Sequence, residues 1–244
     1  MNTLFLIGPG GVGKSTVGAL LAQAMSYRLI DLDSEFCERI LNIRQYIQCN
    51  GYERYVRDNA ALCSRLLAEN PHEKRVVVLS SGFLATDVCP EIVAGNRQLV
   101  RQSGYSILLL PSEDIDIATR IVVARQLMRG FGLVGEKEEI KFRQRLREYC
   151  ALCDCRVISS EEPERVAELV REKVAAEQRK QKSLEAMREL SELSQKLGLY
   201  TKRHAAQLCG YSTGPKIISD RVGRASRRPA ERREQQAIIS RTRK

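Results

Sequence analysis

The stretch Gly8-Pro9-Gly10-Gly11-Val12-Gly13-Lys14-Ser15 has the form G-x-x-x-x-G-K-S. An apolar segment, residues 3–7, directly precedes it, and residues 14–25, whose apolar side chains have helical spacing, follow it. Glycine reaches backbone angles that are closed to other residues, so successive N–H groups of such a loop can face phosphate oxygens. Because it lies between a strand and a helix, the stretch predicts a phosphate-binding loop rather than a chance glycine-rich turn.

Each residue of this loop has an expected role in binding a nucleotide and its Mg²⁺. Lys14 would reach the β- and γ-phosphates of a nucleotide, and the Ser15 hydroxyl would ligate Mg²⁺. The N-terminus of the following helix adds the positive end of its dipole. The remaining nucleotide-binding residues are Gly8, Gly10, Gly11, Val12, Gly13 and Thr16.

Apolar runs and helix-like stretches alternate along the chain from this loop onward. Strands are expected at 3–7, 28–31, 75–79, 106–110 and 156–159, and helices at 14–25, 34–41, 52–68, 115–128, 136–149 and 163–176. This alternation predicts an α/β fold of three layers, with a parallel sheet between helices. No strand ends in the apolar run plus aspartate typical of motor proteins and GTPases, and no N-K-x-D is present, which favours a small kinase.

Two aspartates, Asp31 and Asp33, follow the second expected strand. Residues two apart in a strand face the same side, so both carboxylates are expected to point into the cleft at the strand's C-terminal edge. There one carboxylate would hold Mg²⁺ through water and the other would accept a proton from an attacking hydroxyl; we assign Asp31 to the first role and Asp33 to the second. The alternative is that Asp33 only caps the next helix.

These features together resemble the shikimate kinase family, within the nucleoside monophosphate kinase-like P-loop folds, over roughly residues 1–175. Three later stretches add to the resemblance. Arg145-Leu146-Arg147-Glu148-Tyr149, followed by Cys153-Asp154, is similar to the family's R-x-P-x-Y…A-D, and this implies that Arg145 binds the substrate carboxylate. Arg129 lies where the family has its lid R-P-L-L, and Ser80-Ser81-Gly82 lies where it has G-G-G, which implies substrate binding by Ser81 and Gly82.

The resemblance implies an enzyme that uses ATP and Mg²⁺ to phosphorylate a hydroxyl of shikimate or a similar hydroxylated carboxylic acid, a step of aromatic amino acid biosynthesis. Lys14 and Arg129 would neutralise charge on the transferring phosphoryl group, and Asp33 would orient the acceptor hydroxyl. Arg120 would lie against the adenine, unless it is a solvated helix residue. For Arg145 the alternative is one more surface charge beside Arg143 and Arg147.

Several positions depart from the family pattern. The family's F-R-x-x-E aligns with Tyr55–Asn59, which puts Val56 where a second carboxylate-binding arginine is expected. Arg57 is the next residue, but one helix step turns about 100°, so it cannot simply take that place. Two of the three glycines of G-G-G are Ser80 and Ser81, and the lid proline is Gly130. The phosphate-donor half is therefore intact and the acceptor half is altered.

Charge is placed unevenly along the 244 residues. Residues 177–244 contain 17 Lys and Arg against 7 Asp and Glu, which accounts for the whole net charge of +10. The sequence therefore predicts a kinase-like domain at 1–176 and a basic extension at 177–244, with a helix at about 177–197 and then a weak helix-turn-helix-like pattern or a disordered tail. As an alternative function, the kinase-like part is a nucleotide sensor and the extension binds nucleic acid. A solubilising tail is equally consistent.

The compartment follows from what the sequence lacks. Its apolar runs are a few residues long, whereas a membrane span needs about 20. The first residues have no basic start and predict a buried strand rather than a signal peptide, so a cytosolic location and no membrane association are expected. The eight cysteines are expected to be thiols. Cys150, Cys153 and Cys155 lack a second C-x-x-C, so no zinc site is predicted.

Overall fold

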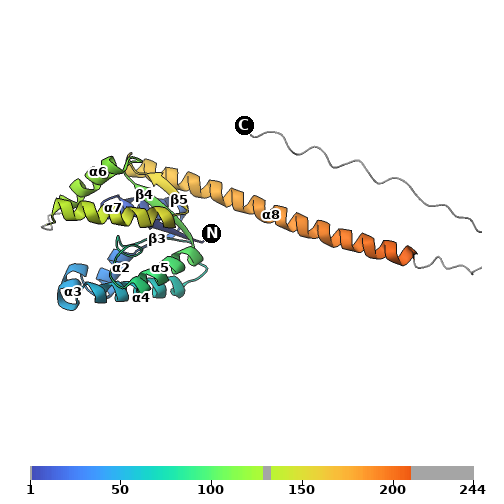
Figure 1. The fold of residues 1–244 in the computed structure, drawn as a ribbon, viewed down its shortest axis with the longest axis horizontal. Coiled ribbons are helices and arrows are strands. Elements are labelled where there is room, and N and C mark those ends of the chain that lie inside the picture. The colour runs from blue at the N-terminus through green and yellow to red at the C-terminus, as the bar shows by residue number, and fades with distance from the viewer. Residues whose placement is uncertain (1, 129–132, 210–244) are drawn as a thin grey trace, which may run out of the picture. The chain divides into compact units, whose positions relative to one another are not determined.

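The structure is a computed structural model that describes residues 2–128 and 133–209, with side chains described up to residue 198 (Figure 1). Its five strands are β1 Thr3–Ile7, β2 Arg28–Asp31, β3 Arg75–Val78, β4 Tyr105–Leu110 and β5 Cys155–Ile158. Its helices are α1 Lys14–Met25, α2 Leu32–Arg39, α3 Ile43–Asn50, α4 Tyr52–Glu69, α5 Pro90–Ser103, α6 Ile115–Leu127, α7 Gly135–Leu152 and α8 Pro163–Cys209.

The strands form one parallel sheet in the order β2-β3-β1-β4-β5, and helices lie on both sides of it (Figure 1). All five residues of β1 and all four of β3 are buried, as strands inside a parallel sheet covered by helices on both faces require. In register, Leu6 pairs with Val78, and Asp31 pairs with Val78 on its other side. The ends of β1, β2 and β3 therefore meet at one edge of the sheet. The predicted α/β parallel-sheet fold is confirmed.

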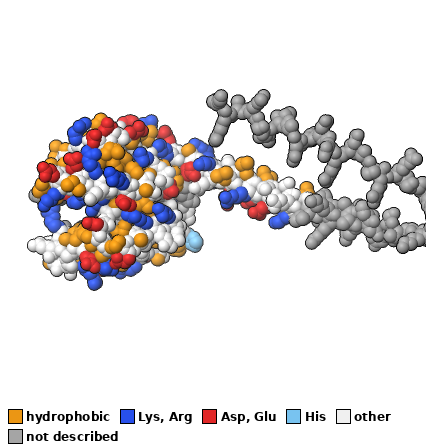
Figure 2. All heavy atoms as spheres, in the orientation of Figure 1, with side chains coloured by type: hydrophobic (Ala, Val, Ile, Leu, Met, Phe, Trp, Pro, Cys, Tyr) orange, Lys and Arg blue, Asp and Glu red, His pale blue; other side chains and the backbone are white. Residues whose placement is uncertain are grey.

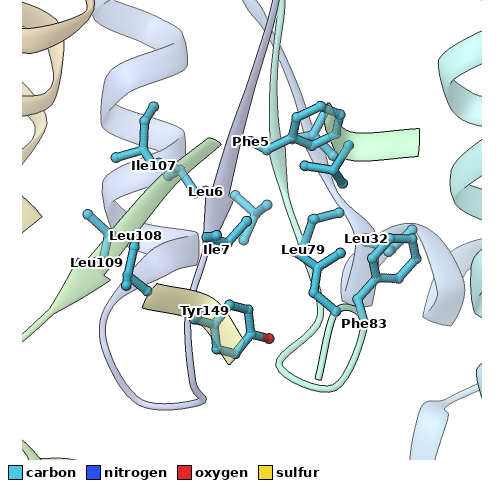
Figure 3. Packing of buried hydrophobic residues seen from close by; sticks show 14 of the residues in the cluster. Phe5, Leu6, Ile7, Leu32, Leu79, Phe83, Ile107, Leu108, Leu109 and Tyr149 are labelled. Carbon is cyan, nitrogen blue, oxygen red and sulfur yellow. The ribbon is translucent and has the colours of Figure 1, made fainter. Parts of the chain in front are cut away.

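The core continues from the sheet into the loops that follow the strands. Figure 3 shows Leu79 and Phe83, which flank the loop after β3, facing the same cluster as Ile7 and Leu32. Leu32 and Leu79 are 0% and 2% exposed, so the segments that follow β2 and β3 are both anchored at their first residues. Apolar burial of this kind fixes the backbone from which the site is built.

Two helices that the sequence pattern does not reveal are α3 and α5. Helix α3 has eight residues and buries none of them fully, although Ile43, Tyr46 and Ile47 share one face and pack, partly buried, against the core. It is held at its start by Asn42, whose Oδ1 accepts hydrogen bonds from the N–H groups of Arg44 and Gln45. Helix α5 begins with Pro90 and contains Gly95, a residue that weakens the helical pattern.

Helix α8 runs without interruption past Ala176, where the charge imbalance of the sequence begins. Val166, Val170 and Val174 on its first turns are buried in the core. The chain divides into two compact units, Met1–Met187 and Arg188–Lys244. The boundary after Ala176 stays a prediction, and most of the helix-turn-helix-like pattern and all of the tail that follows it fall on residues 210–244, outside the described residues.

Charged side chains of both signs are interspersed over the visible face of the folded unit, as expected from the balanced charge of the first 176 residues (Figure 2). None of the helices in the described ranges has the length and apolar character needed to span a membrane. The seven cysteines whose side chains are described, Cys37 to Cys155, are free thiols. The described part of the chain holds no cluster of three or more His, Cys, Asp or Glu side chains suited to a metal ion.

Candidate active site

The loop between β1 and α1 has the conformation that its sequence predicts. Gly11 and Gly13 have φ values of +83° and +89°, a region that side-chain-bearing residues rarely adopt. Lys14 is 8% exposed, and its Nζ donates hydrogen bonds to the carbonyls of Gly8 and Pro9 at 2.8 and 2.9 Å. Val12 is 1% exposed and anchors the loop in the core. The ammonium of Lys14 is thus held across the concave side of the loop.

The end of helix α6 lies against this loop. The Nη1 of Arg125 donates to the Gly11 carbonyl at 3.2 Å. The side-chain nitrogen of Gln126 occupies the space that a Cβ on Gly10 would need, so a side chain at Gly10 would displace it. Arg125 also lines a cavity of about 840 Å³ together with Gly13 and Thr16. A nucleotide on the loop would therefore meet Arg125.

The resemblance implies nucleotide-binding roles for two arginines, Arg120 on α6 and Arg129 just after it, and the described part of the structure places neither of them at the phosphate loop. Arg129 lies outside the described residues, so its role as lid arginine stays a prediction. Arg120 is exposed and is not among the residues that line the cavity beside the loop. Among the described residues, Arg125 is the arginine that contacts the loop. The sequence carried a signal for it, because Arg125-Gln126-Leu127-Met128 keeps the arginine and the first leucine of R-P-L-L.

The predicted geometry of the two aspartates is wrong, because only Asp31 belongs to strand β2. Helix α2 begins at Leu32, two residues before the predicted start, and Asp33 lies in its first turn. The Oδ1 of Asp31 caps this helix by accepting from the N–H groups of Asp33 and Ser34 at 3.1 and 3.3 Å. The cap is therefore Asp31 and not Asp33, and the two carboxylates are not related by strand alternation. Asp33 nevertheless lines a cavity.

This second cavity, of about 910 Å³, brings together all four residues predicted to bind substrate. They are Asp33, Ser81, Gly82 and Arg145. The Nη1 of Arg145 donates to the Ser81 hydroxyl at 3.4 Å. A Cβ on Gly82 would stand 2.6 Å from the Tyr52 hydroxyl oxygen and 3.5 Å from Nη2 of Arg145. Polar groups from α4, α7 and the loop after β3 therefore converge on Gly82.

Tyr149 fixes the loop after β3 to helix α7. It is 1% exposed, and its hydroxyl donates to the Ser81 carbonyl at 2.7 Å. Figure 3 shows this hydroxyl turned toward the loop that carries Leu79 and Phe83. Burial raises the pKa of Tyr149, so the hydroxyl keeps its proton and stays a donor throughout the physiological pH range.

Helix α4 contributes no arginine to the cavity that holds Arg145. Val56 is 7% exposed and packs in the hydrophobic core. Arg57 is directed elsewhere, because its Nη2 pairs with Glu53 at 2.9 Å and with Glu91 at 3.0 Å. From α5, Arg97 lines the cavity, and it pairs with Glu148 at 2.9 Å. The departure at Val56 therefore leaves α4 without a guanidinium in the wall of this cavity, and the second arginine there, Arg97, comes from α5.

Comparisons with known proteins bear on the same region. The family model described as shikimate kinase matches residues 10–177. Shikimate kinase 2 of Photorhabdus laumondii is 29% identical over 175 residues, which cover 69% of this chain and 93% of the relative. Shikimate kinase of Persephonella marina is 33% identical over 110 residues, 45% of this chain and 61% of the relative.

Solved structures share the fold. Shikimate kinase from Aquifex aeolicus superimposes with a TM-score of 0.57 at 17% identity, over 72% of this chain and 97% of that one. Shikimate kinase from Acinetobacter baumannii in complex with shikimate gives a TM-score of 0.58 at 18% identity, over 72% and 94%. At these identities the structural likeness describes the fold.

Proposed function

The chain belongs to the shikimate kinase family, and from this premise we propose that it transfers the γ-phosphoryl group of ATP to a hydroxyl of shikimate. Members of this family are ATP-dependent phosphotransferases with an alcohol acceptor. One observation carries the proposal for this chain. A single edge of the sheet presents the phosphate loop with Lys14, the carboxylate of Asp33, and a cavity that contains Arg145.

The donor half would act by positioning and by charge. Lys14 would exchange its bonds to the Gly8 and Pro9 carbonyls for the β- and γ-phosphates, and Arg125, which contacts the loop at Gly11, would neutralise further charge. The donors Ser15 and Asp31 are oxygen ligands of the kind that suit Mg²⁺, which takes one or two protein ligands together with phosphates. When bound, Mg²⁺ would lower the cost of bringing negative charge together.

The acceptor half would hold the acid and aim its hydroxyl. Arg145 would bind the carboxylate through its planar guanidinium, with the Ser81 hydroxyl beside it. Asp33 would accept a hydrogen bond from the reacting hydroxyl and take its proton as the new bond to phosphorus forms. The cavity of about 910 Å³ also has apolar walls, including Ile43 and Ile47, which would exclude water from the acceptor.

An ADP-release assay with a panel of hydroxylated acids, shikimate first, tests this function. The full-length chain is expected to release ADP when shikimate is added, and Lys14→Ala is expected to lower kcat about 100- to 1,000-fold. Lys180→Ala, an exposed lysine of α8, is the matched control and should behave as wild type. ADP release with another acid but not with shikimate would overturn shikimate as the acceptor, while the assignment as an ATP-dependent kinase would stand.

The basic segment 177–244 adds a further proposal about partners. Its 17 Lys and Arg against 7 Asp and Glu favour contact with nucleic acid through released counterions. The cytosolic location expected from the sequence likewise stays a prediction.

A further inference from the structure

Beside the acceptor cavity lies a buried pair of polar side chains that the proposed function does not use. They are Asn59 of α4 and Ser80 of the loop after β3, which are 3% and 5% exposed. We infer that Ser80, held by Asn59, is a positioning residue that fixes the carboxylate of Asp33 toward the acceptor hydroxyl. This inference rests on the proposed function, because Asp33 is the group that would orient the acceptor.

The register of the sheet brings Ser80 to Asp33. Asp31 at the end of β2 pairs with Val78 at the end of β3, and the two strands are parallel. Asp33 and Ser80 each lie two residues beyond this pair, so the chain places them side by side where both segments leave the sheet. The Ser80 hydroxyl donates to Oδ1 of Asp33 at 2.5 Å. Nδ2 of Asn59 lies 3.1 Å from the oxygen of the same hydroxyl.

Hydrogen-bonding chemistry gives this chain of groups a single direction. An ionised carboxylate only accepts, an amide nitrogen only donates, and a hydroxyl has one proton. The proton between Ser80 and Asp33 must therefore come from Ser80, and the Asn59 amide must donate to a lone pair of the Ser80 oxygen. The Asn59 amide occupies one of the two lone pairs of the Ser80 oxygen, and the acceptor Asp33 sets the direction of its proton. Asn59 thus restricts the rotation of the hydroxyl, and the hydroxyl holds the carboxylate.

The side-chain oxygen of Asn59, unpaired among the described residues, indicates that its amide group does more than fill space in the core. Its Oδ1 is buried and has no hydrogen-bond partner within the described part of the chain. Native proteins rarely leave a buried polar atom unpaired, because its lost hydration is not replaced. An apolar side chain of the same size would avoid that cost and would serve packing alone equally well. What an apolar side chain would not supply is the N–H donated to Ser80.

Both members of the pair depart from the family pattern described above. The family's F-R-x-x-E has a glutamate where this chain has Asn59, and its G-G-G has a glycine where this chain has Ser80. In this structure the two substituted positions are in direct contact. Because one change supplies the amide donor and the other supplies the hydroxyl that receives it, they act together on Asp33.

Steady-state kinetics with the full-length chain test the inference. Ser80→Ala is expected to lower kcat about 10- to 100-fold, the cost of a misplacement of up to about 1 Å at a reacting group, while KM for shikimate changes less than about threefold. Asn59→Leu should lower kcat in the same direction by a smaller factor, and it also serves if Ser80→Ala does not fold. Ser80→Thr keeps the hydroxyl and should restore kcat. Ser64→Ala, elsewhere on α4, is the control.

A double-mutant comparison separates positioning from a general structural role. If Ser80 acts through Asp33, Ser80→Ala should have almost no further effect on kcat once Asp33→Ala is present. Full additivity would overturn the inference, as would a Ser80→Ala variant that keeps wild-type kcat. A loss that appears only in KM would also overturn it. If the wild-type chain turns over no acid of the panel, the proposed function falls together with this inference, whereas turnover of shikimate with unchanged kcat in Ser80→Ala removes the inference alone.

Discussion

Replacement of Arg145 by alanine gives a quantitative test of the acceptor cavity. Val56 is buried in the core and Arg57 is paired with Glu53 and Glu91, so α4 contributes no second guanidinium to the cavity. A hydrogen bond to a charged group contributes about 1.5–3 kcal/mol, and each 1.4 kcal/mol is a factor of about ten in affinity. Arg145→Ala is therefore expected to raise KM for shikimate about 10- to 150-fold, with kcat within about threefold, since the contact is made before and during the transfer.

The neighbouring arginines of α7 supply the controls for this measurement. Arg147 is exposed, and Arg143 pairs with Asp116 at 2.6 Å and with Glu139 at 2.9 Å, away from the cavity. Arg147→Ala and Arg143→Ala should leave KM for shikimate unchanged, and all three variants should leave KM for ATP unchanged in the ADP-release assay. Equal effects from the three substitutions would mean that Arg145 is only one more surface charge, and the assignment of the carboxylate site would be refuted.

Four further predictions follow from the described contacts. Gly82→Ala should raise KM for shikimate about tenfold without changing KM for ATP, because its Cβ would stand 2.6 Å from a tyrosine hydroxyl and would push it aside. Arg125→Ala should lower kcat about 100-fold, and a loss seen with Arg129→Ala but not with Arg125→Ala would contradict the assignment made from the loop contact. Asn42→Ala should lower the free energy of unfolding by about 1 kcal/mol in urea titration, and an unchanged midpoint would contradict its capping role. Removal of residues 188–244 should preserve phosphotransfer and weaken salt-sensitive nucleic acid binding, and no binding by the full chain at low salt would refute that contact.

The parts of the structure that could be predicted from the sequence are those determined by nearby residues. Strand β1, the phosphate loop and α1 begin and end where the pattern places them, because apolar runs, glycines and helical spacing act within a few residues. The parallel sheet follows from the alternation of such segments. The convergence of Ser81, Gly82 and Arg145 was predictable only through the resemblance, since nothing in their spacing indicates that they meet.

The parts that could not be predicted depend on contacts between distant segments. The strand rule failed at Asp33 because Asp31 caps a helix that starts one residue after it, which turns the next residues out of the strand. Ser80 and Asn59 read as mere departures from a pattern until the register between β2 and β3 brings Ser80 to Asp33. Helix α3 is only eight residues long, so the apolar face formed by Ile43, Tyr46 and Ile47 is too short a pattern to reveal a helix by itself.

The bond from Tyr149 to the Ser81 carbonyl has a mechanical consequence. Together with the contact between Arg145 and the Ser81 hydroxyl, this bond fixes the last turns of α7 to the loop after β3, which lines the acceptor cavity. Any swing of α7 that keeps these bonds must pivot there. Lys137, on the same wall of the cavity, is eight residues from Arg145, the nearer of the two fixed positions, which gives a lever arm of about 12 Å at 1.5 Å per residue. A tilt of about 10° would then carry Lys137 about 2 Å across the cavity mouth while the loop after β3 stays in place.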